Sequence, residues 1–456
     1  MEQTSISMFW RRLPLLLWGS FTVAVLVSLA ETYQWAAIPP VAGAVLRWVF
    51  LVFVCAWAWR RGSLTTWILV SMLIGAEVGH DFPEFAQYLK IVSKIFLKLI
   101  KTIVAPLLFG TLVVGIAGHA DLKQVGRMGW KSLLYFEVVT TIALVIGLVA
   151  INVSKAGVGI NLPPAAEQEE VAVTKQTWDE IILHIFPENI AKSIYEGQIL
   201  QIVVFSVIFG IGLAMLKGEP RKNMLNFAEG LSEVMFKFTA IVMYFAPFAV
   251  GAAIAYTVGH MGLGILVNLF KLLATLYAAL IFFMLFVLLP IALYIKLPIK
   301  KFIQAIAEPV SIAFATTSSE AALPKALQAM EEFGVPRKIA AFVLPTGYSF
   351  NLDGTTLYLS LATIFVAQAS GIHLDWGQQL LIVFTLMLTS KGVAGVPRAS
   401  LVILMGTAVS FGLPVEPIFI ILGIDELMDM ARTATNVIGN CLATTVVSRW
   451  EKEGDF

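Results

Sequence analysis

Charged residues are scarce in this sequence, and their scarcity decides the class of protein. Lysine, arginine, aspartate and glutamate make up 13% of the 456 residues, whereas hydrophobic residues make up 58%. The mean hydropathy is +0.85. Soluble domains carry about 25% charged residues, so a soluble globular fold is excluded. The composition predicts a polytopic membrane protein of the all-α class.

Cysteine, histidine and excess basic charge are also in short supply. The two cysteines, Cys55 and Cys441, lie in different apolar segments and offer neither a disulfide framework nor the spacing of a metal site. The formal net charge of +1 provides no basic surface for nucleic acid. We therefore expect no metal, no cofactor and no nucleic-acid partner. The five histidines fall near predicted span ends or in loops: His80, His119, His184, His260 and His373.

Apolar runs long enough to cross about 30 Å of hydrocarbon recur along the chain. Those before residue 300 lie near 13–30, 42–59, 65–79, 92–118, 132–153, 197–217, 228–256 and 262–296. Two interrupted apolar segments, 300–330 and 378–411, then precede two long runs, 337–367 and 414–448. The alternation of lysine and arginine between run ends places both termini in the cytoplasm if the interrupted segments re-enter from the side where they started. We therefore expect ten transmembrane helices and two re-entrant helical hairpins in the inner membrane.

The two interrupted segments and the runs that follow them repeat one plan. The first reads "IAFATTSSEAALPKAL" and then "LPTGYSFNLDGTTLY"; the second reads "MLTSKGVAGVPRASLVIL" and then "IDELMDMARTATNVIGN". Each interrupted segment has a small-residue tip that ends in proline, Pro324 or Pro397. An odd number of crossings separates the copies, so one is inverted relative to the other. Inverted repeats built around broken helices are typical of secondary transporters.

Polar residues interrupt the run 337–367 at its centre. Asn351 and Asp353 lie between Gly347 and Gly354. Non-helical backbone at membrane depth is tolerated only where protein or a water-filled cavity satisfies its polar groups. The pattern predicts a locally unwound helix that presents carbonyl groups and side chains to a ligand.

The last long run carries a polar stripe. Five residues spaced by four, three, four and four positions fall within about 80° on one helix face. A charge inside hydrocarbon is costly, and ionisable groups there usually mark functional sites. The alternative is a strip of internal salt bridges that only holds the helix bundle together. The stripe consists of Asp425, Asp429, Arg432, Asn436 and Asn440.

The stripe suits a small ligand with both signs of charge. The planar guanidinium of Arg432 matches a carboxylate in a bidentate manner, and Asp429 can accept an ammonium group. The hydroxyls of Ser318 and Ser319, with backbone N–H groups at the segment tips, can hold a second carboxylate. Such a ligand is aspartate or glutamate, bound at the site without a chemical reaction.

These motifs resemble those of the glutamate/dicarboxylate:cation symporter family, the relatives of the excitatory amino-acid transporters. The resemblance runs from about residue 65 to the C-terminus and rests on "TSSEAALP", "NLDGTT", "SKGVAGVP" and "DELMDMARTATNVIGN". It is closest to the proton-coupled bacterial glutamate/aspartate branch. The resemblance implies a homotrimer in the lipid bilayer, in which each protomer has a static scaffold and a mobile transport domain. It further implies that the two re-entrant hairpins act as gates and that the transport domain crosses the membrane in an elevator fashion.

The resemblance also implies a division of the chain. Residues 1–64 lie outside it and add two transmembrane spans before the usual eight. The parts that follow are the first scaffold and transport-domain spans at 65–152, an extracellular loop at 153–192, scaffold spans at 193–256, a transport domain at 257–448 and a cytoplasmic tail at 449–456.

Family roles carry over to residues of this sequence. Arg432 is expected to bind the side-chain carboxylate of the substrate and Asp429 its amine. The branch specialised for C4-dicarboxylates tends to lack an acidic residue at the position of Asp429, so its presence favours an amino acid. The full set of expected substrate-binding residues is Arg432, Asp429, Asn436, Thr433, Ser318, Ser319, Thr355, Val393 and Gly395.

The sodium sites of the family are degenerate in this chain. Asn440 stands where sodium-coupled members usually have aspartate, and Val393 replaces a hydroxyl residue. Phe136 and Val139 stand where a tyrosine and a threonine are expected. Asn351 and Asp353 remain but have lost partners in every site, and Gly347 is a further position of these degenerate sites. Hard cations require several oxygen ligands, so we expect that sodium is not the coupling ion. The ammonium group of Lys391 would occupy a position where the family binds a cation.

A buried carboxylate would then carry a proton, since burial favours its neutral form. Four candidates lie in the apolar runs: Glu137, Asp353, Asp425 and Glu320. Glu137 stands out because it adjoins the lost sodium ligands. The alternative is that Glu137 only forms a structural pair with Lys391.

Other functions fit parts of the pattern. A C4-dicarboxylate symporter or a sodium-coupled acidic amino-acid transporter would use the same fold, and a passive anion channel is also compatible with it. An intramembrane aspartyl protease would pair Asp353 with Asp425, but two carboxylates that share a proton are poorly served by Arg432 beside them. The pattern therefore favours a transporter over an enzyme.

Overall fold

The computed structural model describes residues 13–27, 39–118, 122–160, 183, 186–196, 198–391 and 398–454. All regular elements in these ranges are helical, which confirms the predicted all-α class. The predicted tip residues Val393, Gly395 and Pro397 lie outside the described residues. The chain forms two compact units, residues 1–96 with 244–266 and residues 97–243 with 267–456.

The first unit is built on helices with small residues at their contacts. It contains α2 (Pro40–Arg61), α3 (Leu64–Asp81), α4 (Pro83–Tyr88), the start of α5 (Lys90–Ala117) and α11 (Ala246–Met261). Helices α3 and α11 pack along each other, and the buried face of α11 is rich in alanine. Small side chains allow two helices to approach closely in a membrane protein. A further apolar helix, Leu13–Val27, precedes α2.

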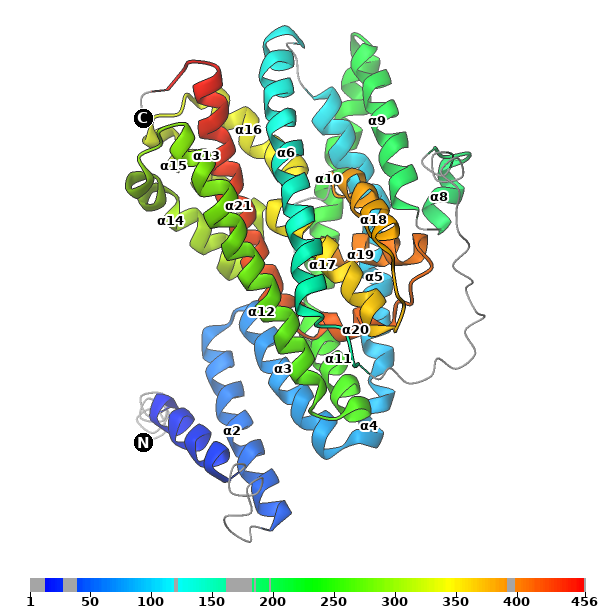
Figure 1. Ribbon diagram of the computed structural model, residues 1–456, viewed down its shortest axis with the longest axis vertical. Helices are drawn as coiled ribbons and strands as arrows, with labels where there is room; N and C mark the ends of the chain where they lie inside the picture. The colour runs from blue at the N-terminus through cyan, green and yellow to red at the C-terminus, as the bar shows by residue number, and fades with distance from the viewer. Residues whose placement is uncertain are drawn as a thin grey trace. The chain divides into compact units, whose positions relative to one another are not determined.

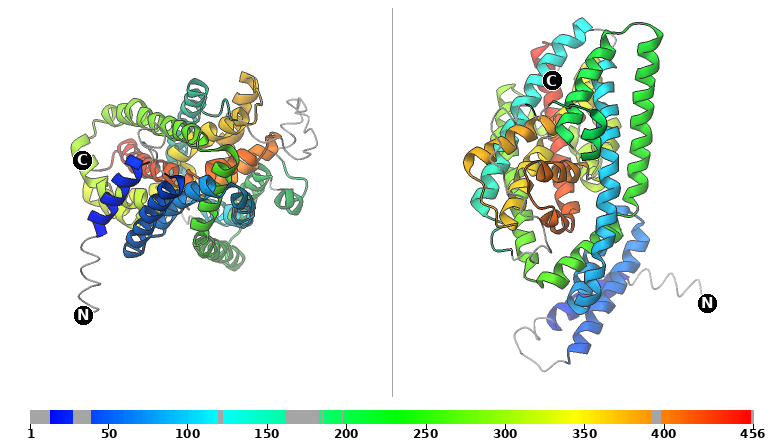
Figure 2. Two further views of the ribbon diagram at one scale, coloured as in Figure 1. Left: turned by 90° about the horizontal axis from the view of Figure 1, so that it is seen from below. Right: turned by 90° about the vertical axis from the view of Figure 1, so that its right-hand side faces the viewer.

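The second unit contains the polar motifs. Its helices are α6 (Leu122–Ser154), α8 (Ile190–Glu196), α9 (Ile199–Met215), α10 (Glu219–Met243), α12 (Ile265–Phe283), α13 (Leu289–Tyr294), α14 (Ile299–Thr316), α15 (Ser319–Phe333), α16 (Arg337–Phe350), α17 (Asp353–Ala369), α18 (Trp376–Thr389), α19 (Ala399–Ser410), α20 (Glu416–Leu422) and α21 (Asp425–Trp450). A π-helical turn, Met284–Leu288, joins α12 to α13. Figures 1 and 2 show α21 (red) lying among α14, α15 and α16 (light green to yellow), and all three helices contact it.

The interrupted segments form pairs of short helices. In 300–330, α14 ends at Thr316, Thr317 adopts the left-handed conformation with φ 52°, and α15 begins at Ser319. In 378–411, α18 ends at Thr389 and α19 begins at Ala399. The helices within each pair contact each other. That either pair re-enters the membrane from one side stays a prediction.

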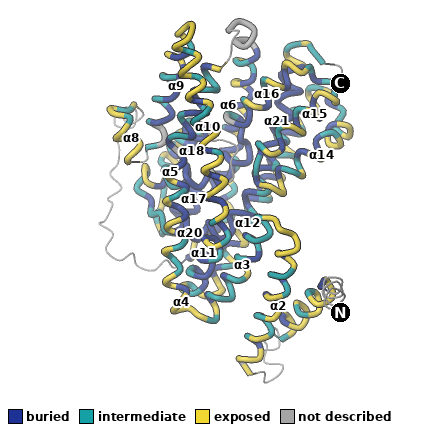
Figure 3. The backbone as a smooth tube through the Cα atoms, turned by 180° about the vertical axis from the view of Figure 1, so that it is seen from behind, coloured by how far each residue is buried: buried dark blue, intermediate teal, exposed yellow. Residues whose placement is uncertain are grey.

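The predicted break in the run 337–367 is confirmed. Helix α16 ends at Phe350, Asn351 and Leu352 are not helical, and α17 begins at Asp353. Helix α17 is buried along nearly its whole length, with Gln368 as the exception, and it is dark blue in Figure 3. The break therefore lies inside the unit, where its backbone groups need protein partners.

Among the described residues, four helical stretches are long and apolar enough to cross a bilayer: Val41–Arg61, Pro83–Ala117, Met128–Ser154 and Ile265–Tyr294. Helices α10 and α11 supply a fifth if they count as one span. Helix α17 has only 17 residues, and α21 carries charged groups and amides. Helix α17 is therefore short for a span, and the charged residues of α21 lower its hydropathy although they are buried inside the protein. The number of ten spans stays a prediction.

Candidate functional site

The polar stripe of α21 faces the break between α16 and α17. All five stripe residues are buried, with at most 4% of any of them exposed. The side-chain oxygen of Asn436 accepts hydrogen bonds from the backbone N–H groups of Gly354 at 2.8 Å and Thr355 at 3.2 Å. The amide of Asn440 donates to the Asn351 carbonyl at 3.0 Å. The first N–H groups of a helix lack partners within it, so α21 satisfies the groups that the break leaves open.

The two glycines of the motif permit this contact. Gly354 lies against the backbone of Arg432, and Gly347 lies against the side-chain amide of Asn440. A Cβ atom at either position would overlap these atoms. The glycines at these two positions thus have a steric role, because only a residue without a Cβ atom lets the broken helix approach α21 this closely.

Arg432 is the centre of a buried charge network. Its Nη1 and Nη2 atoms donate to the two Asp425 oxygens at 2.9 and 3.4 Å, and its Nε donates to Asp429 Oδ1 at 2.8 Å. The Thr433 hydroxyl donates to the same Asp429 oxygen at 3.1 Å. The Arg432 Cζ atom lies 4.2 Å from the centroid of the Tyr358 ring, a distance typical of a cation–π contact. The stripe therefore does form internal salt bridges along α21, as the alternative interpretation of its spacing predicted.

The tip of the first helix pair holds the predicted serines. The Ser318 oxygen caps α15 by accepting a hydrogen bond from the Ala321 N–H group at 3.2 Å. Ser319 is fully buried and its hydroxyl has no hydrogen-bond partner. Helix α15, which carries Ser319 and Glu320, contacts α21. A buried hydroxyl without a partner costs free energy, so Ser319 is available to a bound polar ligand.

Lys391 lies beside the break, at the C-terminal end of α16. Its ammonium group donates to the Thr140 hydroxyl at 2.7 Å and to the Phe350 carbonyl at 3.3 Å, and it lies 3.2 Å from Glu137 Oε2. The Phe350 carbonyl belongs to the last turn of α16, where the helix dipole attracts a cation. The structure therefore places Lys391 beside the break and pairs it with Glu137, as the alternative reading of Glu137 required.

A small amide and carboxylate cluster lies at the break itself. The Asn351 amide donates to Asp353 Oδ2 and to Asn440 Oδ1, both at 3.4 Å. Asn351, Asp353 and Asn440 are fully buried. Asp353 Oδ1 and Asn351 Oδ1 have no hydrogen-bond partner. Phe136 and Val139 of α6 are buried hydrophobic residues and supply no side-chain oxygen. A charged carboxylate with an open oxygen in this setting is costly, and a proton relieves the cost.

Sequence reasoning missed two members of the site, Arg398 and Glu426. Arg398 is fully buried, its Nη2 donates to Glu426 Oε2 at 2.7 Å, and its backbone N–H donates to Asp429 Oδ2 at 3.0 Å. The arginine directly after the second small-residue tip and the glutamate directly after Asp425 were the available signals. Glu426 falls beside the stripe and not within it, so helical spacing alone did not select it.

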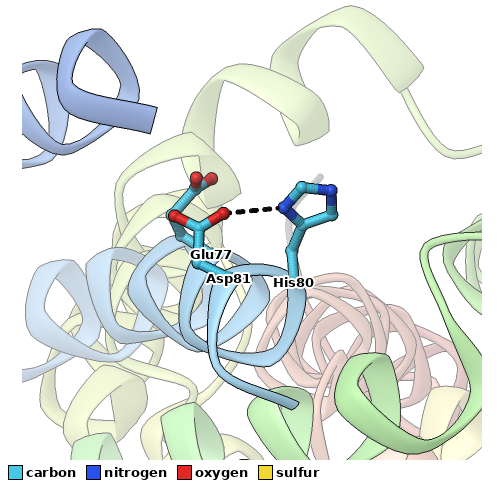
Figure 4. Close-up of side chains that lie close together, drawn as sticks. All are labelled: Glu77, His80 and Asp81. Atoms are coloured by element: carbon cyan, nitrogen blue, oxygen red, sulfur yellow. Dashed lines mark hydrogen bonds and ion pairs between the residues drawn. The ribbon is translucent and has the colours of Figure 1, made fainter. Parts of the chain in front are cut away.

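A group of two carboxylates and one histidine lies in the first unit. Ligand atoms of Glu77, His80 and Asp81 lie within 4.8 Å of one another (Figure 4). Arg47 of α2 forms ion pairs with both carboxylates, and the Trp48 indole donates to Asp81 Oδ2 at 2.9 Å. These oxygens already have cationic and neutral donors, so we assign the group to the attachment of α2 to α3.

Comparison with known proteins assigns the chain to a family. The sequence profile of the sodium:dicarboxylate symporter family matches residues 64–450. The chain is 43% identical over 403 residues to the proton/sodium-glutamate symport protein of Geobacillus stearothermophilus, covering 86% of this chain and 95% of that protein.

Two further relatives carry different substrates in their names. The chain is 42% identical over 395 residues to the C4-dicarboxylate transport protein of Paraburkholderia phymatum, covering 85% of this chain and 92% of that protein. It is 41% identical over 411 residues to the proton/glutamate-aspartate symporter of Escherichia coli, covering 86% and 94%.

These matches confirm the resemblance and its starting point near residue 65. The names of the family and of the relatives denote transporters and not enzymes. Together with the apolar helices, they identify a membrane protein whose polar residues gather around a broken helix. This chain belongs to the sodium:dicarboxylate symporter family.

Proposed function

We propose that this protein is a proton-coupled, sodium-independent symporter of acidic amino acids, L-glutamate or L-aspartate. The observation that carries the proposal is the buried network of Arg432, Asp429 and Asp425 beside a broken helix whose other end holds the ammonium group of Lys391. The names of two relatives, which refer to glutamate and aspartate, agree with this substrate class.

The substrate half of the proposal rests on Arg432 and Asp429. The guanidinium already binds the Asp425 carboxylate with two of its nitrogens, so its geometry suits a substrate carboxylate. The Asp429 carboxylate accepts three hydrogen bonds at present and would accept an ammonium group in place of one of them. Thr433 donates a hydrogen bond to Asp429, and the Asn436 amide donates one to the Thr355 hydroxyl. Asn436, Thr355 and Thr433 are also proposed to contact the substrate. Ser318, Ser319, Val393 and Gly395 are proposed to bind the other carboxylate from the two tips.

The coupling half of the proposal rests on Lys391. Its ammonium group lies at the carbonyl end of α16 and beside Thr140, close to Phe136 and Val139, which lack the oxygens that a sodium ion requires. A positive charge in this position offsets the dipole of α16 without a bound cation. Sodium is therefore not needed to complete this part of the site.

Among the proton-carrier candidates, the geometry favours Asp353. It is fully buried and one of its oxygens has no partner. Glu137, in contrast, has 44% of its side chain exposed and is paired with Lys391. Asp425 is held by Arg432, and Glu320 lies in the first turn of α15. We therefore assign the proton to Asp353.

The oligomeric state and the transport mechanism are proposed from the family resemblance. We propose a homotrimer in the inner membrane with both termini in the cytoplasm, and a transport domain at 257–448 that moves against scaffold spans within 65–152 and 193–256. The re-entrant segments 300–330 and 378–411 would gate the site in alternating access of the elevator type.

A C4-dicarboxylate is the second candidate substrate, because a relative at 42% identity carries that name. The two candidates are separated by uptake of radiolabelled glutamate into proteoliposomes, with unlabelled aspartate or succinate as the competitor. If Asp429 accepts the substrate amine, aspartate should compete more strongly than succinate. Stronger competition by succinate would assign the protein to C4-dicarboxylates instead.

A further inference from the structure

Arg398 adopts a conformation that its side chain does not favour. It immediately precedes α19 and has φ 64° and ψ 9°, in the left-handed region. Residues other than glycine seldom occupy this region because Cβ crowds the backbone. Arg398 is also fully buried, which is rare for arginine without a compensating partner. An unfavourable backbone and a buried charge at one residue make Arg398 a candidate for a functional role.

Those contacts lead directly to the proposed amine site. The Arg398 guanidinium donates to Glu426 Oε2 at 2.7 Å, and the two side chains are 0% and 1% exposed. The backbone N–H of Arg398 donates to Asp429 Oδ2 at 3.0 Å. Asp429 Oδ1 in turn accepts from Arg432 at 2.8 Å. A continuous chain of hydrogen bonds therefore runs from Glu426 through Arg398 and Asp429 to Arg432.

The guanidinium contact and the backbone N–H contact of Arg398 have different structural effects. The guanidinium fastens residue 398 to α21 through Glu426, since a buried ion pair with close geometry resists separation. The backbone N–H then fixes the direction of the Asp429 carboxylate. Because the pair consists of one positive and one negative group, it adds no net charge to the site. The backbone N–H contact links the pair to a ligand through the position of Asp429.

We infer that the Arg398–Glu426 pair positions Asp429 and thereby sets the preference of this site for amino acids over dicarboxylates. The inference rests on the proposed function, in which Asp429 accepts the substrate amine. Aspartate and succinate have the same carbon skeleton and two carboxylates, but only aspartate has an ammonium group. A displaced Asp429 carboxylate therefore weakens the binding of aspartate and leaves the binding of succinate largely unaffected.

The test compares binding of aspartate and succinate to purified protein with the variants Arg398→Gly, Arg398→Lys, Glu426→Gln and the double variant R398G/E426Q. Glycine suits the backbone conformation and keeps the N–H group, so Arg398→Gly removes the side chain with its guanidinium while the backbone contact to Asp429 can persist. We expect it to raise the Kd for aspartate about tenfold, the loss typical of a hydrogen bond to a charged group, and to change that for succinate by less than about threefold. Asp429→Ala serves as the reference for complete loss of the amine site.

The double variant separates positioning from folding. Arg398→Gly alone leaves the Glu426 carboxylate buried without its guanidinium, which lowers the melting temperature. R398G/E426Q removes that charge, so we expect its melting temperature to recover while the loss of aspartate selectivity persists. Arg398→Lys keeps a cation for Glu426, and we expect it to retain part of the selectivity.

The outcomes distinguish this inference from the proposed function. If wild-type protein prefers aspartate and every variant loses both ligands in equal proportion, the pair is merely structural and the inference is wrong. If the folded double variant keeps the wild-type ratio of the two Kd values, the inference is also wrong. If wild-type protein binds neither ligand, the proposed function itself is overturned.

Discussion

At the scale of single residues, the site depends on groups that satisfy one another across helices. Asn436 caps the start of α17 from a different helix, and Arg432 joins Asp425 and Asp429 on α21. The stripe could be predicted because it repeats within one helix. The Arg398–Glu426 pair could not, because spacing along one helix contains no information on a partner 28 residues away in another segment.

Arg432→Ala tests the carboxylate site. The change removes the only group in the stripe that can bind a carboxylate through paired N–H donors, so we expect no measurable binding of glutamate or aspartate. Binding is measured by competition against radiolabelled glutamate in detergent. Arg449→Ala, at the exposed end of the same helix, is the matched control and should bind with wild-type affinity. Retained binding in Arg432→Ala would remove the basis of the substrate assignment.

Asp353→Asn tests the proton carrier. The amide keeps the size of the side chain but cannot gain or lose a proton, so we expect uptake driven by a proton gradient to fall by about tenfold or more. Exchange of internal for external substrate should persist, because exchange needs no net proton movement. Glu137→Gln is the comparator and should keep proton-driven uptake. The reverse result, with only Glu137→Gln uncoupled, would transfer the role to Glu137.

At the scale of elements, the break between α16 and α17 is the feature that builds the site. Its place was predictable because Asn351 and Asp353 have no reason to interrupt an apolar run other than contact with protein or ligand. The exact partners were not predictable, since the approach of α17 to α21 depends on the shape of both helices. The short helices α18 and α19 followed from the interrupted segment, but the burial of Arg398 at the start of α19 did not.

Gly354→Ala tests the close contact of α17 with α21. The added methyl group would overlap the Arg432 backbone, and overpacking in a tight core costs about 1–3 kcal/mol. We expect a lower melting temperature and weaker substrate binding. Gly212→Ala in α9 is the control, because nothing lies within 4 Å of its Cβ position, and it should be neutral or stabilise by up to about 1 kcal/mol. Equal melting temperatures for the two variants would mean that α17 does not need glycine at this point.

At the scale of the whole molecule, the family match and the first unit divide the chain differently. The match starts at residue 64, whereas α2 lies before it and is tied to α3 through Arg47, Trp48 and Asp81. The sequence predicted an additional pair of spans at 1–64 but gave no function for it. We therefore expect α2 to contribute to the stability of its unit, because its polar groups bind α3 and the candidate site lies in the other unit.

Arg47→Ala tests this assignment. Its loss leaves Glu77 and Asp81 without the cation between them, so we expect a lower melting temperature, by the equivalent of about 1–3 kcal/mol. The affinity for glutamate should not change. The measurement is a thermal melt with a parallel binding curve. A change in affinity with an unchanged melting temperature would show that α2 acts on transport and not on stability.

Transport in liposomes with separately imposed gradients of protons, sodium and potassium tests most directly whether a proton and not sodium drives uptake. We expect an inwardly directed proton gradient to accumulate glutamate or aspartate with sodium absent from both sides. A sodium gradient alone should add nothing. Accumulation that requires sodium, and fails under a proton gradient alone, would contradict the role given to Lys391 and Asp353.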